Sequence, residues 1–266
     1  MEAETYTYIK ATVKKVLNID LNYYKDEQMK RRLDSWLVRT RQPGWPEYFK
    51  LCQQAPEELS KLRDYLTINV TEFFRDPDRW DMLRKGVMPD LIKEASARPG
   101  DPKRGLRVWS AGCSIGVEAY TLAILLDEVT PTFSNYLLAT DFDRGALAKA
   151  KARGPYNTDE IRNLSPQQRS HHLDMGTGNF IKETTAKKVT FREQNLLEDK
   201  FEGNFDLIVC RNVVIYFTNE AKAHLYVKFR AALRPGGVLF LGGTEIIPRP
   251  QELGLRNHGI SFYINQ

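Results

Sequence analysis

Cysteine and histidine are scarce in this chain, and neither occurs in a metal-binding or disulfide pattern. Cys52, Cys113 and Cys210 are scattered and odd in number, and of the four histidines only His171 and His172 are neighbours. Zinc sites need closely spaced ligand pairs, and small secreted folds use an even set of cysteines. We therefore expect reduced intracellular thiols and no metal site.

Long apolar runs are also missing. No stretch approaches the ~20 residues that cross a bilayer. The first residues, Met1-Glu-Ala-Glu, are acidic where a secretory signal has an apolar core. We expect a cytoplasmic protein without membrane insertion. The 266 residues are 42% hydrophobic, enough for one large or two small domains, and the net charge of +5 permits an acidic partner without indicating nucleic acid.

The most informative stretch that is present runs from Leu106 to Tyr120. Leu106–Trp109 favour a strand, residues 112–116 read Gly-Cys-Ser-Ile-Gly, and Tyr120–Leu126 predict a helix with a buried face. In an α/β sheet, a strand, a glycine turn and a helix present a small ligand at the carboxyl end of the strand. Gly112 lets the backbone approach such a ligand closely.

Four interpretations of this turn compete. A dinucleotide site needs G-x-G-x-x-G, which the turn does not match. A nucleophile elbow is compatible, because the turn satisfies G-x-S-x-G with Ser114 as the nucleophile. A site for S-adenosylmethionine (SAM) tolerates looser glycine spacing, since no pyrophosphate is bound. An ordinary strand-to-helix turn would need glycine for geometry alone.

The next predicted strand favours the SAM interpretation. Residues 136–141 end on Asp141, where a carboxylate can accept hydrogen bonds from a ribose diol. A hydrolase elbow gives no reason for this acid. An elbow also normally follows an oxyanion loop, and nothing before Leu106 reads as one.

The periodicity of the whole chain predicts two domains. Residues 1–95 read as helical, and residues 96–266 alternate strands and helices as a doubly wound α/β sheet of about seven strands with an antiparallel edge hairpin. Residues 154–188 read as an insertion in that sheet. The apolar positions at helical spacing in the first domain are Ile9, Val13, Val16, Leu17, Met29, Leu33, Trp36 and Leu37.

The second predicted helix is strongly basic. These basic residues have two interpretations: they form a solvated face, or they form a surface that binds an acidic partner. The residues concerned are Lys25, Lys30, Arg31, Arg32, Arg39 and Arg41.

Five segments in order resemble the bacterial chemotaxis receptor methyltransferases, the CheR family. The resemblance runs from about Leu17 to Tyr263. The segments are Thr-Ile-Asn-Val-Thr-Glu-Phe-Phe-Arg (67–75), Val-Trp-Ser-Ala-Gly-Cys-Ser (108–114), Ala-Thr-Asp-Phe-Asp (139–143), Cys-Arg-Asn-Val-Val-Ile-Tyr-Phe (210–217) and Leu-Arg-Pro-Gly-Gly-Val-Leu-Phe (233–240).

This resemblance implies transfer of a methyl group from SAM, with S-adenosylhomocysteine as product, to glutamate side chains on the cytoplasmic helices of methyl-accepting chemoreceptors. It also implies a small all-helical N-terminal domain followed by a Rossmann-like class I SAM-dependent methyltransferase domain. A small antiparallel β-subdomain is inserted at about residues 154–188. We expect a monomer that binds no nucleic acid.

The resemblance also implies the residues of the SAM pocket. Asp141 suits the ribose hydroxyls, Glu118 the methionyl ammonium and Asn195 the adenine edge, while Arg211 contributes its backbone. The turn residue Gly112 completes the set. The family's pocket positions are Asn69, Thr71, Arg75, Glu118, Asp141, Asn195, Leu196, Arg211 and Asn212.

Two residues are predicted to flank the transferred methyl group. Arg75 can hold the incoming glutamate carboxylate by paired hydrogen bonds. Tyr216 can orient that carboxylate or pack against the sulfonium. The structural alternative is that Arg75 pairs with Asp76 or Asp78 and Tyr216 fills the core; for Asn69 and Thr71 it is loop capping.

The chain departs from the family at the glycine turn. Ile115, Val117 and Ala119 stand where the family has Thr, Glu and Pro, which predicts a looser helix start and weaker SAM binding. Two other functions stay open: a receptor-binding module that senses SAM without turnover, and a class I methyltransferase with another substrate. The short insertion predicts weak or no binding of a receptor's C-terminal pentapeptide.

Overall fold

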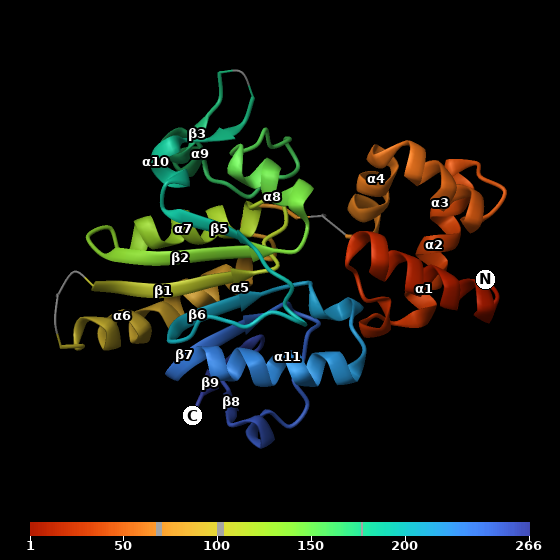
Figure 1. Cartoon of the computed structure of the whole chain (residues 1–266). Helices are drawn as coiled ribbons and strands as arrows, with labels where there is room; N and C mark the ends of the chain where they lie inside the picture. The colour runs from red at the N-terminus through yellow and green to blue at the C-terminus, as the bar shows by residue number, and fades with distance from the viewer. Residues whose placement is uncertain (68–70, 100–103, 177) are drawn as a thin grey trace. The chain divides into compact units, whose positions relative to one another are not determined.

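The computed structural model describes residues 1–67, 71–99, 104–176 and 178–266, which form two compact units (Figure 1). The first contains the described residues of 1–69 and Ile215–Ala223. The second contains the described residues of 70–214 and His224–Gln266. No helix in the described ranges is long and apolar enough to cross a bilayer.

Up to residue 67, the first unit is built from helices, as the sequence predicted. α1 buries Tyr6, Ile9 and Val13 on one face, whereas Val16 is 39% exposed, so the inclusion of Val16 in the buried face was wrong. The bounds of these elements are α1 (Ala3–Leu17), η1 (Leu21–Tyr23), α2 (Asp26–Thr40), α3 (Trp45–Gln54) and α4 (Pro56–Leu66).

The basic residues of α2 do not form one uniform face. Arg32 is half-buried, donates a hydrogen bond to the Tyr65 carbonyl and lies 4.8 Å from the centre of the Tyr65 ring. Lys30 lies 5.0 Å from the centre of the Tyr6 ring. Arg31 is exposed. The guanidinium of Arg32 therefore packs within this unit, whereas the side chain of Arg31 is accessible to a partner.

The segment Ile215–Ala223 belongs to the helical unit because it pairs with the chain between η1 and α2. Tyr24 and Phe217 form an antiparallel β-bridge, and the backbone N–H of Lys25 donates to the Tyr216 carbonyl at 3.1 Å. Tyr216 thus belongs to the helical unit, although it follows a strand of the sheet in sequence.

The second unit is built on a seven-stranded sheet in the order β5-β2-β1-β6-β7-β9-β8 (Figure 1). Neighbours from β5 to β7 are parallel, and β9 is antiparallel to both β7 and β8. The predicted doubly wound sheet with an edge hairpin is confirmed. The strands are β1 (Arg104–Ala111), β2 (Ser134–Asp141), β5 (Val189–Glu193), β6 (Phe205–Cys210), β7 (Leu233–Leu241), β8 (Leu255–Asn257) and β9 (Phe262–Asn265).

Helices cover both faces of this sheet. Alternate residues of a strand point to opposite faces, so each face has its own side chains that pack against helices. Leu106 and Val108 of β1 join a buried cluster with residues of the helices from α5 to α8. Trp109 points to the other face and packs 5.6 Å from Phe229 of α11, centre to centre. Outside the insertion, the helical elements after residue 71 are α5 (Pro77–Met82), the π-helical η2 (Leu83–Val87), α6 (Met88–Ser96), α7 (Val117–Val129), α8 (Arg144–Lys151), η3 (Val214–Tyr216), α11 (Asn219–Ala232) and η4 (Pro250–Leu253), and Ile215–Ala223 belong to the first unit.

The insertion contains a small antiparallel sheet, as the family resemblance implied. It comprises α9 (Pro166–His172), β3 (Leu173–Asp174), β4 (Phe180–Ile181) and α10 (Glu183–Ala186), and β3 pairs with β4. Ser165 caps α9 through a capping box with Gln168. The Tyr156 hydroxyl donates to the Ile115 carbonyl at 2.8 Å, which fastens this segment to the glycine turn.

The compact units divide the chain differently from the predicted domains 1–95 and 96–266. Residues of α5, η2 and α6, among them Trp80 and Leu91, are buried in the same cluster as the sheet. Helical periodicity reports that these segments are amphipathic, but it does not report which surface buries the apolar face.

Candidate functional site

The glycine turn after β1 is fastened to the end of β2. The backbone N–H groups of Gly112 and Cys113 both donate to the Thr140 carbonyl, at 2.8 and 2.9 Å. Gly112 has a φ of +84°, and a Cβ at this position would lie 2.6 Å from a methyl carbon of Val213. Glycine is therefore required both by the left-handed backbone and by the loop after β6.

Asp141 ends β2 and holds two turns through its carboxylate. Oδ2 accepts from the Ser114 N–H at 2.7 Å, and Oδ1 accepts from the Asp143 N–H at 2.8 Å. Burial raises the pKa of Asp141 to about 6, although these two hydrogen bonds oppose the shift. An ionised carboxylate has about four acceptor positions, so Asp141 retains capacity for a ribose diol.

Glu118 lies in the first turn of α7 and accepts a hydrogen bond from the Ser110 hydroxyl at 2.8 Å. Burial raises its pKa to about 7; the positive charges of Arg211 and Arg75 oppose this shift, and Glu245 adds to it. A bound cation would favour the ionised form. Glu118 therefore suits an ammonium group.

Arg211 follows β6, and its side chain is fixed by an ion pair and two aromatic rings. Its Nη2 lies 2.7 Å from Oδ2 of Asp76, and its guanidinium lies over the rings of Trp80 and Phe240 at 5.5 and 5.0 Å. Burial lowers its pKa. The expected contact between the Arg211 backbone and the cofactor stays a prediction.

Asn212 continues the same loop in the left-handed conformation, with a φ of 59°. Its backbone N–H donates to Oε2 of Glu245 at 2.9 Å. Sequence reasoning did not identify Glu245 as part of this edge. An acidic residue four positions past the end of β7 was the available signal, because the carboxyl ends of parallel strands meet there.

Asn195 and Leu196 follow β5 on the other side of β2. The N–H of Gln194 donates to the Asp141 carbonyl at 2.9 Å, which places this loop beside the end of β2. The side-chain oxygen of Asn195 accepts from the Leu197 N–H at 3.0 Å, and Leu196 is buried. The amide nitrogen of Asn195 and the second lone pair of its oxygen are both suited to the edge of a base, and the adenine contact stays a prediction.

The remaining predicted site residues are Asn69, Thr71, Arg75 and Tyr216, and they do not all lie in the same compact unit. Asn69 lies outside the described residues, and Thr71 and Arg75 are both half-buried. The Arg75 loop is anchored by the Phe74 N–H, which donates to the Thr121 hydroxyl of α7 at 3.2 Å. Tyr216 belongs to the helical unit. The prediction that Arg75 and Tyr216 flank the methyl group therefore stays a prediction.

The three departures from the family turn are packed rather than loose. Ile115, Val117 and Ala119 are all buried in the cluster that α7 shares with the sheet. Burial of apolar side chains stabilises a helix start independently of a proline at its first position. The predicted loosening of the helix start and its effect on SAM affinity both stay predictions.

The acceptors at this edge fit one class of ligand. Asp141 and Glu118 offer carboxylate oxygens for a ribose diol and an ammonium, and Asn195 offers an amide for a base. Two partly buried carboxylates would repel the pyrophosphate of a dinucleotide. The residues present therefore fit SAM, which carries an ammonium, a ribose and an adenine but no phosphate.

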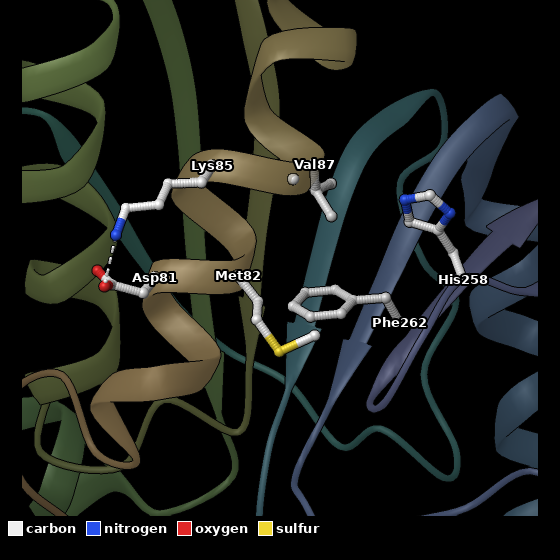
Figure 2. A pocket seen from close by; sticks show the side chains of 7 residues that line it. Asp81, Met82, Lys85, Val87, His258 and Phe262 are labelled. Carbon is white, nitrogen blue, oxygen red and sulfur yellow. Dashed lines mark hydrogen bonds and ion pairs between the residues drawn. The ribbon is translucent and has the colours of Figure 1, made fainter.

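A separate pocket of about 390 Å³ lies between η2 and β9 (Figure 2). Lys85 extends from it towards Asp81, and the two ionic groups are 2.9 Å apart. The lining contains none of the predicted SAM residues, so this pocket is not the candidate cofactor site. Its lining is Asp81, Met82, Lys85, Gly86, Val87, His258 and Phe262.

Comparisons with known proteins point to one family. The CheR methyltransferase SAM binding domain matches residues 69–260, and the CheR methyltransferase all-alpha domain matches residues 4–67. A chemotaxis protein methyltransferase of Listeria innocua serovar 6a is 41% identical over 97% of this chain and 96% of its own length. Chemotaxis protein methyltransferase 1 of Pseudomonas aeruginosa is 36% identical over 77% of this chain and 78% of its own length. The cofactor is SAM.

Replacement of Asp141 is expected to weaken SAM binding. The Asp141→Ala variant should lose ~1.5–3 kcal/mol of binding free energy, since hydrogen bonds to a charged group contribute that much. Calorimetric titration measures this, with folding checked by circular dichroism because Asp141 also holds the Ser114 turn. The control is Glu193→Gln, which alters an exposed acid paired in register with Asp141 on β5. An unchanged dissociation constant in folded Asp141→Ala would place the ribose elsewhere.

Glu118 is expected to make folding stability depend on pH. Its folded pKa of about 7 lies above the ordinary 4.5, so its contribution to the free energy of unfolding is complete below pH 4.5 and lost as pH rises through 7. The loss is at most about 3 kcal/mol. The Glu118→Gln variant should lack this part of the pH dependence in urea unfolding between pH 5 and 8. Parallel pH curves for wild type and variant would contradict the raised pKa; Glu128→Gln, at an exposed acid of the same helix, is the control.

Proposed function

Because the chain belongs to the CheR methyltransferase family, we propose that it methylates glutamate side chains on the cytoplasmic helices of chemoreceptors, with SAM as the methyl donor. The observation that carries this proposal is the nearly full-length match to a chemotaxis protein methyltransferase at 41% identity. Both family domains occur here in the same order as in the proposed enzyme class, an all-alpha domain followed by a SAM binding domain.

The chemistry of the proposed substrate explains the kind of site that the chain needs. A glutamate side chain has a pKa of about 4.3 and is already ionised at pH 7, so no general base has to remove a proton. Bound SAM supplies an electrophilic methyl group, and its acceptance by a carboxylate gives a methyl ester. The protein's residues therefore act by orientation and by exclusion of water, which can contribute a large share of the rate.

Arg75 is proposed to hold the incoming carboxylate. Its positive charge acts on Glu118 and lowers the pKa of that group, which supports a position close to the methionyl end of the cofactor. Its carbonyl accepts from the indole N–H of Trp80 at 3.0 Å, so the backbone at this position is fixed. A guanidinium binds a carboxylate through two parallel hydrogen bonds and so fixes its direction. We propose that Tyr216 orients the same carboxylate.

A surface for the acidic receptor is proposed on α2 of the helical unit. Arg31 is exposed and lacks the packing that fixes Arg32 against Tyr65. Long-range attraction between opposite charges accelerates association and weakens as salt rises. The chain's net charge of +5 is consistent with a preference for acidic partners.

A methylation assay tests the proposed function directly. Radiolabelled SAM is incubated with the protein and membranes that contain methyl-accepting chemoreceptors, and the washed protein fraction is treated with base. Volatile radiolabelled methanol is expected, because a glutamate methyl ester is base-labile. Label that resists base would indicate another acceptor atom, and SAM binding without any transfer would indicate a sensing module.

Replacement of Arg75 is expected to reduce turnover far more than stability. The Arg75→Ala variant should lower kcat by roughly a hundredfold or more, because the carboxylate loses its orientation. Arg75→Lys should restore little, since lysine lacks the planar fork. The same methylation assay measures both variants, and Arg79→Ala, at a half-buried arginine of neighbouring α5, is the matched control. Near-normal turnover in a folded Arg75→Ala protein would mean that another group holds the carboxylate of the incoming glutamate.

A further inference from the structure

We propose that Glu245 is a positioning residue whose buried carboxylate holds the loop after β6 in the shape that receives SAM. Its effect on methyl transfer rests on the proposed function, whereas its effect on cofactor binding rests only on the family's SAM site. The two effects can therefore be measured separately.

The carboxylate of Glu245 accepts three backbone hydrogen bonds. Oε2 accepts from the Asn212 N–H at 2.9 Å and from the Gly242 N–H at 2.7 Å, and Oε1 accepts from the Val214 N–H at 3.0 Å. Glu245 is only 3% exposed. Its two oxygens thus join the end of β7 to two positions of the loop after β6.

This arrangement requires a carboxylate. A glutamine has a single acceptor oxygen and an amide group that only donates, so it cannot satisfy donors on both sides. Buried N–H groups that lose their acceptor are costly, and bonds to an ionised acceptor are stronger than neutral ones. Gly242 also fits the arrangement, because a Cβ there would lie 2.6 Å from Oε2 of Glu245.

The loop that Glu245 holds is the one that faces the glycine turn. Asn212 takes the left-handed conformation, with a φ of 59°, and Val213 approaches Gly112 so closely that no Cβ fits between them. A shift of this loop would therefore disturb the turn that Asp141 anchors from the opposite side. Such coupling means that Glu245 acts on the cofactor site without touching the cofactor.

The chain on the far side of Glu245 is also fixed. The backbone N–H of Ile247 donates to the Tyr263 hydroxyl of β9 at 3.1 Å, and Ile247 is buried. Glu245 is thus held by hydrogen bonds both before and after its own position in sequence. Its carboxylate therefore restrains the loop after β6 by hydrogen bonds from a segment that the sheet holds in place.

The first experiment uses the unaltered protein. Amide hydrogen exchange is measured with and without S-adenosylhomocysteine, and the N–H groups of Asn212, Val214 and Gly242 are expected to be protected before the ligand is added. Protection that appears only with the ligand would overturn the proposal, because the loop would then be shaped by the cofactor rather than by Glu245.

The second experiment compares the Glu245→Gln variant with Glu252→Gln, at an exposed acid in η4. Glu245→Gln should bind S-adenosylhomocysteine about tenfold or more weakly in calorimetric titration, since at least one buried N–H loses its acceptor. Exchange should accelerate more at Asn212 and Val214 than at Ser114, whose N–H keeps the Asp141 carboxylate as its acceptor. An unchanged dissociation constant with unchanged exchange in the folded variant would overturn the proposal.

If Glu245→Gln does not fold, Gly242→Ala tests the same junction. The added methyl group would lie 2.6 Å from Oε2 of Glu245 and 3.0 Å from the Asn212 nitrogen, so the carboxylate and the loop must both shift and the same loss of affinity and protection is expected. Normal affinity and protection in Gly242→Ala would contradict the proposal. A failure of the proposed receptor methylation would leave these binding and exchange results unaffected, which distinguishes the two.

Discussion

The candidate site depends on two carboxylates, one partly and one fully buried, that accept backbone N–H groups at the carboxyl edge of the sheet. Asp141 holds the turn after β1, and Glu245 holds the loop after β6. Both loops contain left-handed residues, Ser114 and Asn212 among them, which cost conformational energy unless neighbouring contacts stabilise them. The carboxylates supply those contacts, and Asp141 also has the acceptor capacity that a ribose requires.

The position of each carboxylate follows from the sheet topology. Parallel strands β2, β1, β6 and β7 are neighbours, so the segments that follow them converge although they are far apart in sequence. Charges of both signs collect there, and the cations of Arg211 and Arg75 limit the pKa rise that burial imposes on Glu118. Carboxylates and guanidinium groups thus influence one another's charge at this edge of the sheet.

Local patterns predicted much of this arrangement. The glycine turn and the acid that ends β2 could be identified because each depends on residues close in sequence. The contacts of Glu245 and the ion pair of Arg211 with Asp76 could not, because they join segments that only the folded sheet brings together. The compact units also divide the chain at other residues than the predicted domains, because helical periodicity does not show which surface an amphipathic helix covers.

The central prediction is that the ribose of the cofactor binds at Asp141 and its methionyl ammonium binds at Glu118. The crystal structure of the complex with S-adenosylhomocysteine tests it most directly. We expect the ribose hydroxyl oxygens within about 2.5–3.2 Å of the Asp141 carboxylate, and the amino group beside Glu118. A ribose bound elsewhere, with Asp141 still bonded only to the Ser114 and Asp143 N–H groups, would contradict it.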